Sequence, residues 1–196
     1  MIPALLVAFV ALAAVGLMLF QVGRSTTLRA QAQTGADAGA VAGAEAVRAD
    51  ILAQVQAWLA SGGWTKGPPV VRLLPALDPV VGGACSAYAT RNTTVATSCL
   101  RSGQRVKADV LSVDSIDPQD AARVNINGQP RGRAQADACV FVQGSIILVG
   151  GGGCSSIPSG AGFDPARFTT LPIGLDGVDV ASLLGLKVTV RLVPTT

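Results

Sequence analysis

The sequence predicts an α+β protein with the shape of a lollipop: a long hydrophobic α-helix over residues 1–60, followed by a disulfide-tethered, β-rich globular domain over residues 61–196. Three observations lead to this prediction. Residues 1–23 carry no ionisable side chain, a helical pattern continues from there to residue 60, and all four cysteines follow the helix. The remainder contains short runs in which apolar and polar residues alternate, which is typical of half-buried strands.

The first segment, residues 1–23, is apolar on every side of the predicted helix. Twenty helical residues rise about 30 Å, which is the thickness of the hydrocarbon core of a bilayer. Such a helix is expected to cross a membrane or to lie in the core of a filament, rather than on a membrane surface. A buried core helix and a cleaved signal peptide are the alternatives. The segment lacks the basic start of a signal peptide, and the helical pattern continues through Arg24.

The second segment, residues 24–60, is rich in alanine and contains Gly35, Gly39 and Gly43 at intervals of four residues. Each glycine inside a helix costs about 1 kcal/mol relative to alanine, so three of them indicate a stripe that another backbone approaches closely. The stripe is expected to pack against another subunit or against the chain's own domain, unless it reflects only an Ala- and Gly-rich composition. The helix-packing interface predicted along the whole helix consists of these residues: Leu5, Phe9, Leu12, Gly16, Phe20, Gly35, Gly39 and Gly43.

The last turns of the helix are amphipathic. Ile51, Val55, Trp58 and Leu59 follow the i, i+4, i+7, i+8 spacing, which predicts a stripe that docks on the globular domain. The run Ser61-Gly62-Gly63 then ends the helix.

Several short segments of the remainder are predicted to be strands. The dipeptide Asn127-Gly128 is a strong hairpin signal. Long Gly-, Pro- and Ser-rich loops, notably 150–178, separate the strands. The predicted strands cover 105–110, 123–126, 139–142, 145–149 and 187–193.

The four cysteines predict two disulfides in an oxidising compartment. Cys85, Cys99, Cys139 and Cys154 contain no Cys-x-x-Cys pair, so they suit neither a zinc ribbon nor a thioredoxin-like site. Of the three possible pairings, the sequential one, Cys85 with Cys99 and Cys139 with Cys154, closes two short loops and is preferred. Four free thiols in a reducing cytoplasm are the alternative.

The disulfides and the flanking charges give opposite orientations for a membrane helix. Disulfides place residues 61–196 outside the cell, whereas Arg24 and Arg29 favour the cytoplasm for the side on which they lie. One resolution is that a basic leader preceded Met1 and was removed after insertion, as in the processing of a type IV-like prepilin.

The composition excludes several functions. The chain has no histidine, which excludes Ser-His-Asp and Cys-His catalysis, a His-ligated haem and zinc sites that need imidazole. The net charge of +3 is small and scattered, so no nucleic-acid partner is predicted. We therefore expect no enzyme, no cofactor and no metal site. Asn92 begins the sequon Asn92-Thr93-Thr94 and is a candidate for glycosylation on an exposed loop.

The first quarter of the chain resembles a known family. The polar-Gly-Arg junction Gln21-Val22-Gly23-Arg24, followed by the Ala-rich segment 28–44 with its Gln and Asp residues, is similar to the TadE/TadG-like pilins of Tad (Flp) pilus systems. The resemblance covers residues 1 to about 50 and implies a type IV pilin-like filament subunit. Many type IV-like pilins carry Glu at the fifth position, where this chain has Leu5, so pairing of that Glu with a neighbour's amine is not implied.

The resemblance implies a structural subunit of an extracellular Tad-type pilus, a helical filament of identical subunits that acts in adhesion or surface attachment. The subunit would enter the inner membrane as a precursor, be handled by the pilus assembly machinery, and display its domain on the cell surface. The main alternative is a single-pass, membrane-anchored extracellular domain that binds a partner. An exported enzyme with Asp or Ser chemistry is a third, which the missing histidine disfavours.

Overall fold

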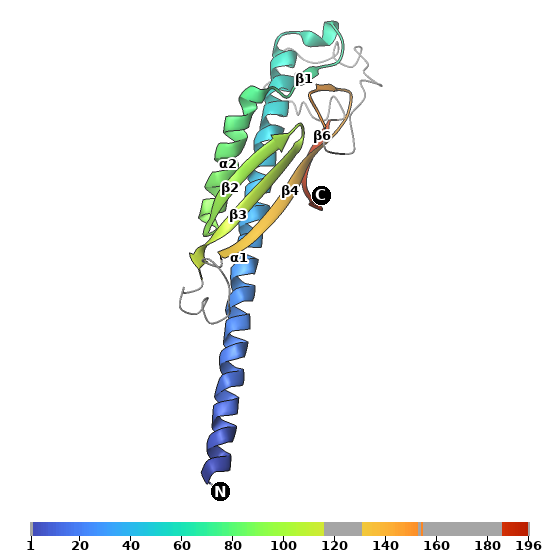
Figure 1. Cartoon of the computed structure of the whole chain (residues 1–196). Coiled ribbons are helices and arrows are strands. Elements are labelled where there is room, and N and C mark those ends of the chain that lie inside the picture. The colour runs from blue at the N-terminus through green and yellow to red at the C-terminus, as the bar shows by residue number, and fades with distance from the viewer. Residues whose placement is uncertain (1, 116–130, 153, 155–185, 196) are drawn as a thin grey trace.

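The computed structural model describes residues 2–115, 131–152, 154 and 186–195 (Figure 1). Helix α1, Ile2–Ala60, is one continuous helix of 59 residues. Its C-terminal half is packed against the large sheet, the second helix and the first short strand, and its N-terminal half extends away from them (Figure 1). The α+β fold class, with a long helix followed by a sheet domain, is therefore confirmed.

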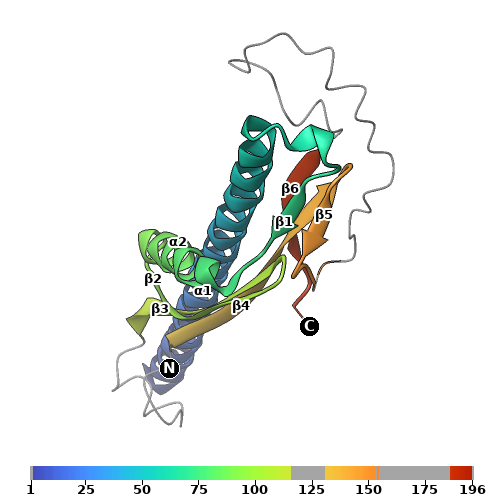
Figure 2. The same ribbon diagram turned by 90° about the horizontal axis from the view of Figure 1, so that it is seen from above.

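The domain is built on a four-stranded antiparallel sheet in the order β2-β3-β4-β6. These strands span Thr94–Ser102, Arg105–Ser115, Arg131–Gln143 and Lys187–Val193. A separate parallel pair joins β1, Val70–Arg72, to β5, Ile147–Val149. Helix α1 and a second helix, α2, Asp78–Arg91, form a layer over one face of the large sheet (Figure 2). Two short 3₁₀ turns, η1 (Gly63–Thr65) and η2 (Pro75–Leu77), lie between the helices.

Helix α2 was not predicted within the β-rich region 61–196. Two adjacent glycines, Gly82 and Gly83, lower its helix propensity and hide it from sequence reasoning. Pro79 lies in the first turn, where a proline breaks no hydrogen bond. The helix forms because tertiary packing buries a stripe along one side: Val81, Cys85 and Ala89.

The strands differ from their predicted ranges in length. The strand predicted over 105–110 extends to Ser115, and that predicted over 139–142 begins already at Arg131. The strand predicted over 145–149 is shorter, at Ile147–Val149, and that over 187–193 has the bounds predicted. The predicted hairpin at 123–128 and most of the 150–178 loop lie outside the described residues.

The core lies between α1 and the sheet, and its contacts are graded along the helix. Strand β4 contributes small residues at one end, namely Ala134, Ala136 and Ala138, and the larger Val140 and Val142 at the other. Because small residues of α1 face small residues of β4 there, the helix and the sheet approach closely at that end. The stripe that α1 buries runs from small residues to large: Ala32, Ala36, Ala40, Ala44, Val47, Ile51, Val55 and Leu59.

The three glycines of α1 lie beside this stripe and face the chain's own domain. A Cβ added at Gly39 would lie 3.1 Å from the carbonyl oxygen of Cys85, and one at Gly43 would lie 2.8 Å from Cγ1 of Val106. A Cβ at Gly35 would overlap the side chain of Thr94. Of the two partners considered for this stripe, the domain of the same chain occupies it, which leaves these residues no surface for a neighbouring subunit.

The end of α1 is fixed to the small sheet. Ile51, Val55 and Leu59 are buried, and Trp58 packs against the core. The side-chain amide of Gln54 donates a hydrogen bond to the carbonyl of Arg72 and accepts one from its N–H, both at 2.9 Å. Since Gln54 thus pairs with β1 as a neighbouring strand would, the amphipathic end of α1 positions β1 directly.

The two disulfides join Cys85 to Cys99 and Cys139 to Cys154, with Cα–Cα distances of 6.2 Å and 5.9 Å. This is the sequential pairing. The first links α2 to β2 on the side that faces Gly39 of α1. The second links β4 to the segment that follows β5.

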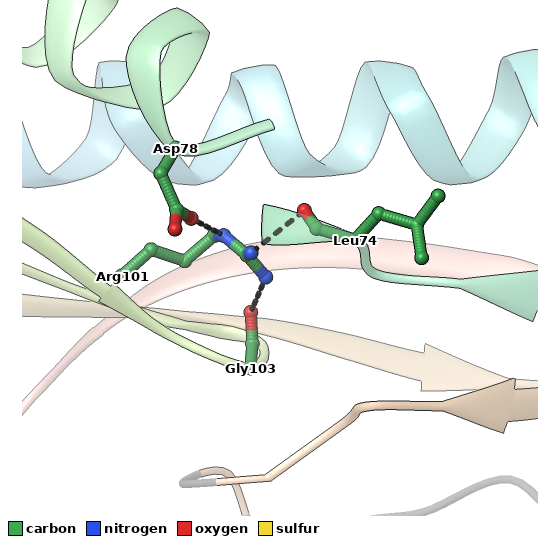
Figure 3. Close-up of polar contacts among 4 residues, drawn as sticks. All are labelled: Leu74, Asp78, Arg101 and Gly103. Atoms are coloured by element: carbon green, nitrogen blue, oxygen red, sulfur yellow. Dashed lines mark hydrogen bonds and ion pairs between the residues drawn. The ribbon is translucent and has the colours of Figure 1, made fainter. Parts of the chain in front are cut away.

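Arg101, near the end of β2, holds the start of α2 in place (Figure 3). Its Nε donates to Oδ1 of Asp78 at 2.6 Å, and its Nη2 and Nη1 donate to the carbonyls of Leu74 and Gly103. The Arg101 side chain is only 6% exposed, so these three acceptors replace the water it loses. Asp78 lies in the first turn of α2, where a negative charge is favourable.

Substituting Gly39→Leu is expected to lower the free energy of unfolding by about 3 kcal/mol, because the new side chain meets the backbone of Cys85. The matched control is Gly16→Leu, where a Cβ has nothing within 4 Å. Urea unfolding of the detergent-solubilised chain, followed by tryptophan fluorescence, measures both. Equal stability of the two variants would show that α1 does not approach α2 as closely as described.

Each disulfide can be removed by replacing both of its cysteines with alanine: Cys85→Ala with Cys99→Ala, or Cys139→Ala with Cys154→Ala. The two disulfides close loops of nearly equal size, since their sequence separations are 14 and 15. Loop entropy alone predicts a loss of about 3 kcal/mol for each. The first pair is expected to cost more, because Cys85 also belongs to the core cluster beneath α1. Urea unfolding without reductant measures the difference, and an equal loss would contradict this role of Cys85.

Candidate functional site

Helix α1 changes character near residue 28. Large apolar side chains from Phe9 to Val22 are between 54% and 74% exposed, and they point in every direction around the helix. Among the residues whose burial is described, Leu28 is the first buried one, and from there the domain covers one side of α1. We call residues 2–27 the stalk. Every stalk residue whose burial the structure describes is exposed.

The predicted interface residues divide between these two parts. Phe9, Leu12 and Phe20 are exposed on the stalk, and Gly16 has open space around it. Leu5 lies in the same helix, but its side chain is outside the described residues. With spacings of four, three, four and four residues, the five positions share one side of the helix. The structure separates them from Gly35, Gly39 and Gly43, which the domain covers.

The stalk is long and apolar enough to cross a membrane, by length and composition. None of its apolar window is buried inside the protein. From Ile2 to Gly23 the helix rises about 33 Å, close to the hydrocarbon thickness of a bilayer. A contiguous apolar surface of this kind marks a membrane or protein contact.

A groove lies where the stalk meets the domain. It has a volume of about 940 Å³ and is open on one side between α1 and the end of β3. Arg24, at its rim, is the first charged residue of the chain, and the first acidic residue is Asp37. The residues that line the groove are Leu19, Phe20, Gly23, Arg24, Thr27, Leu28, Gln31 and Val113.

Two more arginines line a separate depression, which shares no residue with this groove. Arg29 and Arg133 line a second, smaller depression together with polar residues. Arg24, Arg29 and Arg133 are exposed, and none forms an ion pair with a described side chain. Asp37 accepts a hydrogen bond from the side chain of Gln33 at 2.8 Å. The described side chains at this level of the molecule therefore give it a positive charge.

The described residues hold no group of three or more His, Cys, Asp or Glu side chains that could bind a metal. Two buried acids, which the sequence did not single out, lie on the sheet. Asp109 accepts a hydrogen bond from Ser98 at 2.7 Å, and Asp137 lies 3.6 Å from Nε of Arg105. These are contacts between neighbouring strands, and the absence of an enzymatic activity stays a prediction.

Asn92 lies in the turn between α2 and β2, where it is half-buried and caps the C-terminus of α2. Its side-chain amide donates to the carbonyl of Tyr88 at 2.8 Å. Thr94, the third residue of the sequon, is fully buried and donates its hydroxyl to the carbonyl of Ala89 at 2.6 Å. In the folded chain this hydroxyl is not accessible, which counts against glycosylation after folding.

The groove was not predicted from the sequence. Gly23 and Arg24 were recognised as a junction, but the far wall is Val113, which lies 90 residues later in the chain. No local sequence pattern predicts that Val113 lies beside α1. The only signal was that a glycine and the first charge of the chain stand side by side at the end of an apolar helix.

Comparison with known proteins gives one match. Residues 1–48 match the family described as putative Flp pilus-assembly TadE/G-like. No curated protein and no solved structure matches the chain. The match confirms the resemblance over the N-terminal quarter and associates the chain with Flp pilus systems. It includes both the stalk and the first part of α1 that the domain covers.

Proposed function

We propose that this chain, whose residues 1–48 are TadE/G-like, is a structural subunit of an extracellular Tad-type pilus or filament. The observation that carries the proposal is the stalk, whose large apolar side chains are more than half exposed from Phe9 to Val22. Such a surface is not stable in water and has to be covered, first by a membrane and then by the stalks of identical subunits.

The division of α1 supports a specific arrangement for the proposed filament. Because the domain occupies the glycine stripe, we assign the contacts between subunits in the filament core to the stalk, about 40 Å of helix. Stalks would form the core and the domains would lie outside it, where they serve adhesion or surface attachment. The pilus assembly machinery would move the subunit from the membrane into the filament.

The second candidate is a single-pass, membrane-anchored domain that binds a partner outside the cell. The same exposed stalk favours it, since one helix of this length and composition is enough for an anchor. The two candidates differ in whether stalks contact one another.

The double substitution Leu12→Ala with Phe20→Ala is expected to abolish filaments while the chain still inserts into membranes. Each truncation removes apolar contact worth about 2 kcal/mol or more, so association should weaken by at least a hundredfold. Negative-stain microscopy of surface material, together with flotation on vesicles, measures the two properties separately.

The matched control is Val10→Ala with Leu17→Ala, which removes exposed side chains from another side of the same helix. It should leave more filaments than the first variant. Wild-type material that floats with vesicles but never forms filaments would support the anchored domain instead.

A further inference from the structure

We infer that the groove at the base of the stalk binds the headgroup region of an anionic phospholipid while the stalk is inserted in a bilayer. The inference rests on the membrane stage of the proposed function, and its test separates the two. It concerns the eight groove residues named above, of which Arg24 is the only charged one.

The position of the groove along α1 matches the level of the lipid headgroups in a bilayer. About 33 Å of helix from Ile2 to Gly23 fills the hydrocarbon core, so Arg24 comes to lie at its edge. Arginine at this level is within reach of lipid phosphates. The groove is therefore at the height where a phospholipid changes from acyl chain to headgroup.

The order of side chains along the groove follows the order of groups in a phospholipid. Leu19 and Phe20, about 70% exposed, offer apolar walls for the first methylenes of an acyl chain. Arg24 follows one turn later, at the level of the phosphate. Thr27 and Gln31 come next and can bond to a polar headgroup. Thr27 already donates its hydroxyl proton to the carbonyl of Gly23, so its oxygen is left as an acceptor.

Space is available because Gly23 has no side chain. A Cβ built there has nothing within 4 Å, so the groove floor is open between the walls. Across from it, Val113 of β3 is 52% exposed and closes the apolar side. A helix that only spans a bilayer does not require a groove, whereas binding of a lipid between the helix and the domain does.

The charge around the groove selects an anionic lipid over a neutral one. Arg24 lines the groove, is exposed and has no described acidic partner. Arg29 and Arg133 line a separate depression and add positive charge to this end of the domain. A guanidinium donates to two phosphate oxygens at once, and this contact is stronger where water is partly excluded. An arginine near a membrane surface contributes about 1 kcal/mol with anionic lipid, or about fivefold in affinity.

The test is native mass spectrometry of the full chain in neutral detergent, titrated with phosphatidylglycerol or with phosphatidylcholine of the same acyl chains. Wild type should retain several times more phosphatidylglycerol. Arg24→Gln should lower this retention about fivefold. Lys66→Gln, an exposed cation at the far end of α1, should change nothing.

Gly23→Leu separates a groove from a charged surface. It fills the floor while every arginine is kept, so it should reduce retention of both lipids, with the fold verified by urea unfolding. Unchanged retention in this variant, or in Arg24→Gln, would overturn the inference. Displacement of the lipid by millimolar inorganic phosphate would show an anion site without lipid contact and would also overturn it.

Two further results would overturn the inference in distinguishable ways. Dimers that disappear on Gly23→Leu would show that a second copy of the chain fills the groove. Failure of the wild type to float with neutral phosphatidylcholine vesicles would remove the membrane stage of the proposed function as well. Normal flotation without a preference for phosphatidylglycerol would remove only the headgroup site.

Discussion

The close approach of α1 to its own domain is the constraint on which the rest of the structure depends. Between residues 32 and 44 every fully buried residue of the helix is Ala or Gly, and β4 contributes Ala134, Ala136 and Ala138 to the same core. Dispersion contacts strengthen as surfaces approach, so a helix and a sheet without bulky side chains pack with many short contacts. The exposed stalk, the position of α2 and the groove all follow from where this contact begins, at Leu28.

This contact changes how the family resemblance is understood. The matched residues, 1–48, include an exposed apolar part and a covered small-residue part. The Ala- and Gly-rich half of the match has its partner within the same chain. In this protein, the small-residue side of the second half of the family pattern is therefore occupied within the chain. The domain that follows matches no known structure, yet it supplies the partner of that pattern.

Helix α1, the strand β6 and the sequential disulfides could be predicted from the sequence because their signals are local: an apolar run without proline after Pro3, strict alternation, and short Cys spacings. Strand β2 had no such signal, since a register shift between Ala96 and Ser98 interrupts its alternation. Helix α2 was missed because tertiary burial outweighs its two glycines. The sequence could not show whether Gly39 packs against another subunit or against the chain's own domain, because a close backbone contact requires glycine in both cases. The groove depends on Val113, which only the fold brings to α1.

The unbroken path of α1 from the stalk into the domain has a mechanical consequence. A force applied along the stalk is carried into the domain parallel to the helix axis and is resisted by the whole interface from Leu28 to Leu59, about 47 Å long. Contacts loaded in this direction share the load and have to slide together, whereas contacts pulled apart from one end break one after another. The two disulfides join residues 14 and 15 positions apart. Under force, the segments inside these loops cannot extend, because the covalent bonds hold their ends together. The geometry suits a protein that is held at one end and pulled at the other.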